Sequence, residues 1–318
     1  MDGSIRRPLK VGLLLPDSEA EMVGGGTLRW TGFRALARRA EEVGFDSLWM
    51  ADHLLWRHDG QPVDGPWECW SVLAGLAEVT ERVELGSLVT CTGYRNPALL
   101  AKMAATVDEI SGGRLTLGLG AGWHEPEYRA FGYPFDARVS RFEEAYAIIR
   151  GLLRDGHVDF QGRYHSAQEC ELRPRATRSQ GPPIMVGSTG QRMLGLSATS
   201  ADLWNGLAWG HREASELRPD LAKVDAACAA AGRDPITLGR TASVLVALPG
   251  WEAAALPAFH AMAPLRGSAE ELAHTLADYA REGISPLQVL LAPNSLAGVE
   301  AFAPVLALLD GLGDVARP

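Results

Sequence analysis

Residues 83–122 read VELGSLVTCTGYRNPALLAKMAATVDEISGGRLTLGLGAG. The stretch opens with an apolar run over 83–90 and closes with another over 114–122. Between them, Asn96 is suited to cap free N–H groups, and Pro97 fits the first position of a helix with apolar residues at helical spacing. Strands that are apolar without alternation are buried on both faces, as in parallel sheets. The stretch therefore predicts a strand–helix–strand unit of a parallel sheet.

The same alternation continues along the chain and gives eight strand–helix units. A length of 318 residues suits one such barrel and also two smaller domains, so length alone does not decide. Eight units favour closure into a barrel over an open sheet. No GxGxxG follows the first apolar run, which counts against a Rossmann dinucleotide fold. We therefore expect an α/β fold, a (β/α)8 (TIM) barrel in one domain over 1–318. The expected strands are 9–15, 45–52, 83–90, 114–122, 183–187, 201–205, 237–249 and 284–292, and the expected helices include 29–43, 68–80, 97–110, 140–155, 191–199, 212–231 and 296–311.

Two segments depart from this rhythm. Residues 156–182 read as an inserted excursion with a small hairpin, because HVDFQGRYHS places a glycine turn between two short runs. Residues 250–267 are long for a strand–helix loop and mix alanine and proline with large apolar residues, which predicts a mobile lid over the barrel mouth.

The capping boxes that we expect to open helices are Ser140 with Glu143 and Ser268 with Glu271.

The overall composition restricts the kinds of partner and cofactor. The chain carries 39 acidic against 30 basic residues, a net charge of −9, which argues against general nucleic-acid binding. Its four cysteines form no CxxC pair and its eight histidines no HExxH motif, so we expect reduced thiols and no metal. No apolar run is long enough to span a membrane, and no secretory h-region is visible. We expect a cytoplasmic protein that acts on a small molecule.

Candidate chemistry lies at the carboxyl ends of the expected strands, where such barrels carry their sites. His53 follows the strand over 45–52 and suits acid–base work, since the pKa of histidine lies near neutrality. Asp52 beside it is suited to orient a ligand or the histidine. Each residue also has a plain structural interpretation: His53 bonded to a loop carbonyl, and Asp52 capping the following turn.

Glycine-rich turns follow two other strands. The GSTG turn over 187–190 lies between a strand and a helix, and its small residues let backbone N–H groups approach a phosphate. Gly118, Gly120 and Gly122 leave room for a planar ring, with Trp123 as a wall residue. A tight turn without a ligand and close packing inside the barrel explain the same glycines.

Three blocks of the sequence carry a resemblance to a known family. They are SLWMADHL (47–54), LGSLVTCTGYRNPALLAKMAATVDEISGGRLTLGLGAGWHEPEYRAFGYPF (85–135) and PIMVGSTGQRMLGLSATSADLWN (183–205). These blocks resemble the luciferase-like monooxygenase superfamily, in particular its bacterial deazaflavin-dependent branch. The resemblance implies a (β/α)8 barrel with insertions, usually dimeric, that binds coenzyme F420 or reduced FMN with the ring across the barrel mouth. The match fades beyond Trp209.

The resemblance also implies roles for particular residues. His53 lies by the reactive face of the ring, and Trp56 belongs to the same motif. The segment after the third strand backs the ring through a cis peptide bond, which we expect at Ser87–Leu88, and the GSTG turn holds the phosphate. The predicted catalytic residues are thus His53 and Trp56, and the predicted cofactor-binding residues are Asp52, Ser87, Leu88, Thr90, Ala121, Gly122, Gly187, Ser188, Thr189 and Gly190.

One departure from the family pattern bears on the substrate. Related deazaflavin-dependent sugar-phosphate dehydrogenases carry a catalytic glutamate directly after the glycine of the fourth strand, where this chain has Trp123. Oxidation of a sugar-phosphate alcohol is therefore disfavoured, and a reductase or oxygenase that acts on a small apolar substrate is favoured. The substrate itself cannot be named from the sequence.

Three functions remain open. The first is an F420-dependent oxidoreductase, the second a reduced-FMN-dependent two-component monooxygenase with a flavin reductase as partner, and the third a non-catalytic flavin-binding protein. His53 favours catalysis. The arginine-rich, lysine-poor composition is typical of GC-rich bacterial genomes, which favours F420 over FMN. The cations expected near the acidic tail of F420 are Arg192, Arg173, Arg175 and Arg178.

A homodimer is expected to bury the helices over 68–80 and 97–110. An outer helix of a lone barrel needs a broad polar face, and these two show little of one. The residues expected at the interface are Trp70, Val72, Leu73, Leu76, Ala101, Ala104, Ala105 and Val107.

Overall fold

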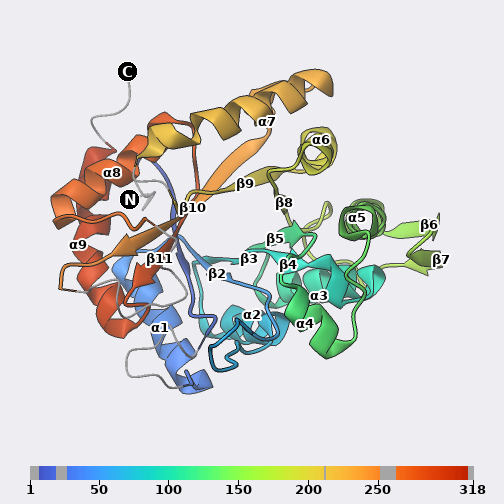
Figure 1. The fold of residues 1–318 in the computed structure, drawn as a ribbon, viewed down its shortest axis with the longest axis horizontal. Helices are drawn as coiled ribbons and strands as arrows, with labels where there is room; N and C mark the ends of the chain where they lie inside the picture. The colour runs from blue at the N-terminus through green and yellow to red at the C-terminus, as the bar shows by residue number, and fades with distance from the viewer. Residues whose placement is uncertain (1–6, 19–26, 211–212, 251–262, 314–318) are drawn as a thin grey trace.

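The computed structural model describes residues 7–18, 27–210, 213–250 and 263–313. Its barrel strands are all parallel and close on themselves, with helices around them (Figure 1), so the predicted (β/α)8 barrel is confirmed. β3 and β4 both pair with β5 and together provide the third of eight barrel strands. The strands are β1 (Val11–Leu14), β2 (Ser47–Met50), β3 (Glu84–Ser87), β4 (Thr90–Cys91), β5 (Leu115–Gly120), β8 (Ile184–Gly187), β9 (Leu203–Leu207), β10 (Gly239–Ala247) and β11 (Leu287–Ala292).

The helices follow the strands as the sequence pattern predicts, and three of their ends are formed by the expected residues. Gly44 ends α1 in the left-handed conformation at φ 103°, and the Asn96 side chain caps α3. Ser268 and Glu271 form the capping box of α8. The helices are α1 (Trp30–Val43), α2 (Cys69–Val79), α3 (Pro97–Ile110), α4 (Glu125–Phe131), α5 (Arg138–Asp155), α6 (Gln191–Ser200), α7 (Arg218–Ala230), α8 (Ala269–Arg281) and α9 (Leu296–Leu312).

The other predicted capping box is wrong. α5 begins at Arg138, so Ser140 and Glu143 lie inside the helix rather than at its start. Their side chains are engaged elsewhere, because Arg192 of α6 donates to the Ser140 hydroxyl at 3.2 Å and to the Glu143 carboxylate at 2.5 Å. These two residues therefore link α5 to α6 at the barrel mouth.

The third barrel strand contains one extra residue. From Gly86 to Thr90 it advances four residues, whereas β5 opposite advances three, from Thr116 to Leu119. A strand with one residue too many bends and bulges out of the ladder. The bulge lies between β3 and β4, at the carboxyl end of the strand.

The non-proline cis peptide bond lies within this bulge, at Leu88–Val89. The predicted position at Ser87–Leu88 is therefore wrong by one bond. The reason is that Ser87 stays in the sheet, where it pairs with Met50, and the Leu88 N–H still donates to the Met50 carbonyl at 2.8 Å. The ladder is interrupted after Leu88 and not before it.

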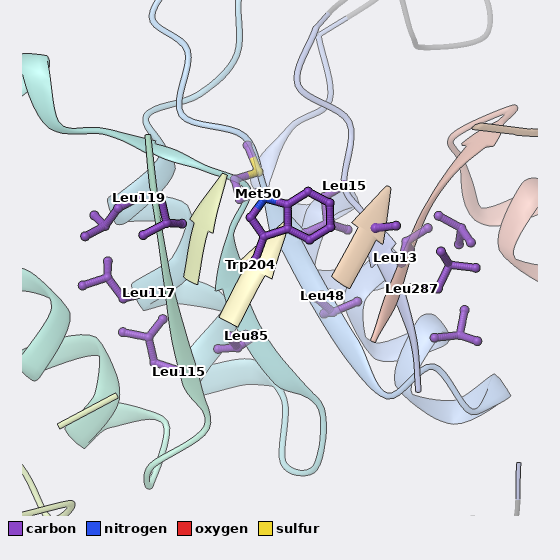
Figure 2. Close-up of a cluster of buried hydrophobic side chains, with 14 of the residues drawn as sticks. Leu13, Leu15, Leu48, Met50, Leu85, Leu115, Leu117, Leu119, Trp204 and Leu287 are labelled. Atoms are coloured by element: carbon purple, nitrogen blue, oxygen red, sulfur yellow. The ribbon is translucent and has the colours of Figure 1, made fainter. Parts of the chain in front are cut away.

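The core has one layer outside the strands and another inside the barrel. Leu115, Leu117 and Leu119 of β5 belong to the large apolar cluster shared with the helices (Figure 2). The residues between them point the other way, into the barrel, because side chains alternate along a strand. Trp49 of β2 packs with Met185 and other interior residues, so the barrel is filled by side chains and is not a pore.

The excursion over 156–182 holds an antiparallel hairpin of β6 (His157–Gln161) and β7 (Ser166–Glu171). The Glu144 carboxylate of α5 accepts three N–H groups of the hairpin turn at 2.8–2.9 Å and ties the hairpin to that helix. Figure 1 shows the hairpin at the outer side of α5, away from the barrel axis.

Two arginines of the excursion lie at the wrong end of the barrel for their predicted role. Arg175 donates to backbone carbonyls at the end of α5, and Arg178 pairs with Asp108 and donates to the Leu115 carbonyl at the start of β5. A segment that leads from a helix into a strand lies opposite the mouth. The prediction that these arginines contact a cofactor tail is therefore wrong. Arg173 pairs with Glu171 on β7.

The residues predicted for a dimer interface are buried inside the single chain. The residues of α2 face the main core, and so do the small residues of α3. Helix faces that lack polar residues pack here against the strands and against each other, so they are not free for a second copy. The prediction that these residues form the interface is therefore wrong, and the homodimer itself stays a prediction. The eight residues are Trp70, Val72, Leu73, Leu76, Ala101, Ala104, Ala105 and Val107.

The predicted lid over 250–267 falls mainly on residues 251–262, which lie outside the described part of the chain. In the range that follows, Leu265 forms a parallel bridge with Val246 of β10. Within the described ranges, no helix is both long enough and apolar enough to cross a membrane.

Candidate functional site

His53 follows β2 at the carboxyl-terminal mouth of the barrel, and aromatic rings surround it. Its ring lies over Trp56 with centroids 3.8 Å apart, and Trp123 approaches edge-on at 5.7 Å. The Trp56 Nε1–H donates to the Asp17 carbonyl at 3.2 Å, which ties the ring to the segment after β1. The two predicted catalytic residues are thus brought into contact, with Trp123 beside them.

The structure adds a residue that the sequence analysis does not single out. Glu127 lies on α4, and its side chain is fully buried. Its Oε1 lies 2.9 Å from His53 Nδ1 and accepts the Tyr94 hydroxyl, while Oε2 accepts the Leu54 N–H at 2.8 Å. Burial raises the pKa of Glu127, but His53 and the donated hydrogen bonds outweigh burial and hold the pKa below its usual value. The carboxylate is therefore ionised beside His53.

Asp52, the other predicted residue at the end of β2, has its carboxylate fully engaged. Arg95 binds it through both guanidinium ends at 2.6 and 2.9 Å, and the Cys91 N–H donates to it at 3.0 Å. Burial lowers the pKa of Arg95, but the carboxylates of Asp52 and Glu68 outweigh burial and raise it. In this arrangement Asp52 joins the end of β2 to β4 and the start of α3.

The bulge brings Ser87, Leu88 and Thr90 to the same region with different surroundings. The Ser87 hydroxyl is bound to the backbone of Gly118 on the neighbouring strand β5, donating to its carbonyl at 2.9 Å and accepting its N–H at 3.1 Å. Leu88 packs against the interior cluster that contains Trp49 and Met185. The Thr90 hydroxyl is buried and has no hydrogen-bond partner among the described residues.

Ala121 and Gly122 follow β5 and hold the loop before α4. The Ala121 carbonyl accepts the Tyr128 hydroxyl at 3.0 Å, and the Gly122 carbonyl accepts Arg138 Nη1 at 2.7 Å. Gly122 has φ 76°, and a Cβ there would collide with the Tyr128 hydroxyl. The glycine is therefore required for the close approach of α4 to the barrel.

The GSTG turn joins β8 to α6. Gly190 is the N-cap of α6 and no side chain caps that helix, so its first N–H groups are free of side-chain partners. The Ser188 hydroxyl is buried and has no partner among the described residues, and Thr189 is exposed next to it. Gly187 packs against Val89 of the bulge. The turn and the bulge are thus neighbours at the mouth.

Two arginines line a hollow near the start of α6. Arg192 on α6 pairs with Glu143 at 2.5 Å. Arg138 at the start of α5 stacks over the Phe135 ring at 4.1 Å, and among the ion pairs of the described residues it has no acidic partner. A surface hollow of about 280 Å³ between the starts of α5 and α6 is lined by Phe135, Ala137, Arg138, Val139, Ser140 and Arg192.

The rim near His53 is aromatic and carries further histidines. The Trp123 side chain is 60% exposed at the mouth, and the His58 and His124 rings lie 5.2 Å apart. His124 Nε2 accepts the Arg57 N–H at 3.2 Å, and burial lowers the pKa of His124, so this imidazole is neutral at pH 7. Trp123 and the neutral His124 therefore form an uncharged part of the rim beside His53.

The predicted residues come from the ends of β2, β3, β4, β5 and β8, which meet at one face of the barrel. Within the described ranges, no group of three or more His, Cys, Asp or Glu side chains is arranged to hold a metal ion. The arrangement offers an acid–base group at His53, an aromatic wall, and a turn with unsatisfied donors beside two arginines. Such a site suits proton-coupled chemistry on an apolar group next to an anionic cofactor.

Known proteins share this fold and parts of this sequence. An F420-dependent glucose-6-phosphate dehydrogenase of Amycolatopsis mediterranei (strain U-32) is 35% identical over 176 residues, which cover 52% of each chain. A pyrimidine monooxygenase RutA of Cronobacter sakazakii (strain ATCC BAA-894) is 33% identical over 209 residues, 63% of this chain and 60% of that one. The chain thus spans about half to three fifths of the length of these relatives.

A solved structure agrees over nearly the whole chain. An F420-dependent secondary alcohol dehydrogenase in complex with an F420–acetone adduct superposes with a TM-score of 0.78, covering 95% of this chain and 99% of that one at 21% identity. At that identity the likeness shows the fold. The family model described as luciferase-like monooxygenase matches residues 9–297, which is most of the sequence. The chain therefore belongs to the luciferase-like monooxygenase family.

Proposed function

We propose that the protein is an oxidoreductase that uses coenzyme F420 for hydride transfer to or from a small, apolar organic substrate. When bound, the deazaflavin supplies or accepts the hydride at a ring carbon. The protein accepts or returns the matching proton: His53 is bonded through Nδ1 to Glu127, which leaves Nε2 for the substrate. A relative named an F420-dependent dehydrogenase supports this choice of cofactor.

The single observation behind the proposal is the GSTG turn at the uncapped start of α6, the helix whose Arg192 lines a surface hollow. The buried Ser188 hydroxyl and the uncapped start of α6 suit a phosphate, so the residues fit such a cofactor. F420 continues beyond its phosphate into an acidic tail, whereas FMN ends there. Arg138 and Arg192 line the hollow at that point and suit such a tail.

The substrate class is inferred from the rim. Trp123 is exposed and lies 5.8 Å from Trp56, ring to ring, and His124 next to it is neutral. Exposed aromatic side chains at a mouth favour an apolar ligand, because they gain from being covered. A glutamate at position 123 is absent, which disfavours alcohol oxidation of a sugar phosphate.

The second candidate is a reduced-FMN-dependent monooxygenase. The relative named pyrimidine monooxygenase RutA favours it, and such an enzyme would need a flavin reductase as partner. A non-catalytic flavin-binding protein is disfavoured by the buried Glu127 beside His53, since binding alone needs no ionised partner for a histidine.

Fluorescence titration with F420 and with FMN, at low and moderate salt, tests the proposal. We expect F420 to bind at least about tenfold more tightly than FMN, and more weakly as salt rises, because the tail is held by exposed charges. Arg138→Gln should weaken F420 about tenfold, which is the range of one charged hydrogen bond, and leave FMN less affected. Arg173→Gln is the matched control, since Arg173 is 76% exposed on the excursion. Micromolar FMN binding without F420 binding would reverse the choice in favour of the monooxygenase.

A further inference from the structure

The carboxylate of Glu127 is surrounded by donors. Oε2 accepts the N–H groups of Leu54 at 2.8 Å and of Leu55 at 3.4 Å, and Oε1 accepts the Tyr94 hydroxyl and lies 2.9 Å from His53 Nδ1. Burial raises the pKa of the Tyr94 hydroxyl far above its usual range, so Tyr94 remains a donor. An ionised carboxylate only accepts, and therefore the hydrogen between Glu127 and His53 belongs to Nδ1.

We propose that Glu127 is a positioning residue that fixes His53 as the Nδ1–H tautomer and thereby directs Nε2 to proton transfer. The role in turnover rests on the proposed function, whereas the tautomer does not. In the neutral imidazole one nitrogen donates and the other accepts, so a partner on Nδ1 decides what Nε2 does. Nε2 then accepts a proton in one direction of the reaction and returns it in the other.

Among the described ionised groups, Glu127 alone contacts the His53 ring. It is therefore the group that sets the tautomer of His53. Its faces meet the rings of Trp56 and Trp123, which are uncharged. His124 lies 6.5 Å away, ring to ring, and is neutral at pH 7. The Tyr94 hydroxyl donates to the same Glu127 oxygen that lies beside His53, and thereby helps to hold the carboxylate in place.

A glutamine at position 127 changes the tautomer by simple geometry. Its amide oxygen is best placed toward the Leu54 and Leu55 N–H groups, which leaves the NH₂ group facing His53 Nδ1. Nδ1 must then accept, and the proton moves to Nε2. An exposed carboxylate on the same helix, Glu125, provides the matched control, because it belongs to the same first turn of α4.

The experiment is long-range ¹H–¹⁵N NMR of the histidine rings in the ligand-free protein, with the His53 signals assigned by their loss in His53→Asn. We expect Nδ1–H for His53 in the wild type and in Glu125→Gln, and Nε2–H in Glu127→Gln. A wild-type Nε2–H tautomer overturns the proposal without any variant. An unchanged Nδ1–H tautomer in Glu127→Gln overturns it as well. Should that variant not fold, the wild-type tautomer and the variant Tyr94→Phe decide, because Tyr94→Phe should keep Nδ1–H.

Kinetics on the loaded enzyme provide the second measurement. Glu127→Gln should lower kcat by about 100-fold or more, the usual contribution of a positioned acid–base group, and leave the dissociation constant of F420 within about threefold of wild type. A kcat within about threefold of wild type refutes the catalytic part of the role. If F420 does not bind to the wild type while the tautomer is as expected, the proposed function fails and the positioning of His53 stands.

Discussion

Trp49 occupies the barrel interior because two neighbouring strands carry glycine next to its ring. A Cβ on Gly12 of β1 or on Gly86 of β3 would collide with the indole, which is buried on all sides. The Trp49 Nε1–H is satisfied by the Ser47 hydroxyl at 2.8 Å, so the ring has a fixed orientation. The tight fit therefore leaves little room for a larger residue at either glycine.

Gly86→Ala should destabilise the protein by about 1–3 kcal/mol, since extra carbon in a packed interior forces side chains out of position. Urea unfolding measures the change. Gly195→Ala is the control: Gly195 lies in α6 with open space around it, and alanine there should be neutral or stabilise by up to about 1 kcal/mol. Equal stability of Gly86→Ala and wild type would mean that the indole moves easily, contrary to this packing.

At the scale of residues, the sequence predicts the position of His53 at the barrel mouth and misses its partner Glu127. His53 directly follows an unmistakable buried strand, so its place at the mouth follows from the fold. Glu127 lies in a helix of seven residues, too short for a periodic pattern to emerge. A signal was present, because Glu127 and the buried Tyr128 follow the glycine turn after β5, but no local rule states which of two nearby glutamates turns inward.

The connection from α2 to β3 depends on one carboxylate of α1. Glu41 accepts the N–H groups of Glu81, Arg82 and Val83 at 2.6–3.2 Å. Burial raises the pKa of Glu41, but the N–H groups of Val83, Arg82 and Glu81 outweigh burial and lower it below its usual value of 4.5. Because the pKa is lowered in the folded state, the stabilisation is present above about pH 4.5 and is lost as the pH falls below it.

Glu41→Gln should therefore cost about 1 kcal/mol of unfolding free energy at pH 7, a figure that allows for solvent screening of a partly exposed group. The difference from wild type should shrink as the pH approaches 3.5. Urea unfolding at the two pH values measures it, with Glu42→Gln as control, since Glu42 is exposed and pairs with Arg39 only at the surface. A difference that stays constant with pH would contradict an ionised Glu41.

At the scale of elements, the sequence predicts which helices and strands exist, but not the contacts that form at their ends. The buried strands are found because apolar runs between turns have few other interpretations. Errors arise where tertiary contacts override a local motif. Ser140 and Glu143 have capping-box spacing, yet their side chains bind Arg192 of another helix. The cis bond is displaced by one residue because sheet pairing extends through Ser87, which the sequence does not reveal.

For the whole molecule, barrel closure follows from the count of eight units, and so does the end at which the site lies. The prediction that arginines of the excursion over 156–182 lie at the mouth contradicts this rule. The excursion leads from α5 into β8, so topology alone assigns it to the amino-terminal end, where Arg175 and Arg178 bind backbone carbonyls. The positive charge of these arginines suggested a role at the mouth, but their place between a helix and the next strand excludes it.

We expect a homodimer, and its interface must be formed by residues that are exposed on the single chain. Trp30 and Trp67 are 40% and 47% exposed, and Trp30 packs over Gly75 on the outer face of α2. A hollow of about 330 Å³ is lined by Trp67 together with apolar residues such as Phe33 and Pro66 and with the polar residues Ser18, Thr27 and Arg29. Exposed apolar surface around large aromatic side chains is typical of an interface, whose core is enriched in tryptophan.

Light scattering at micromolar concentration should therefore give a dimer mass for the wild type and a monomer mass for Trp67→Glu, because a buried unpaired charge opposes association strongly. Ile236→Glu is the control. Ile236 is 87% exposed on the short segment before β10, so the same change of apolar to acidic side chain should leave the mass unchanged there. A wild-type monomer excludes the dimer altogether. A dimer that persists in Trp67→Glu places the interface elsewhere, and Leu99 on the outer side of α3, 54% exposed, is then the next position to charge.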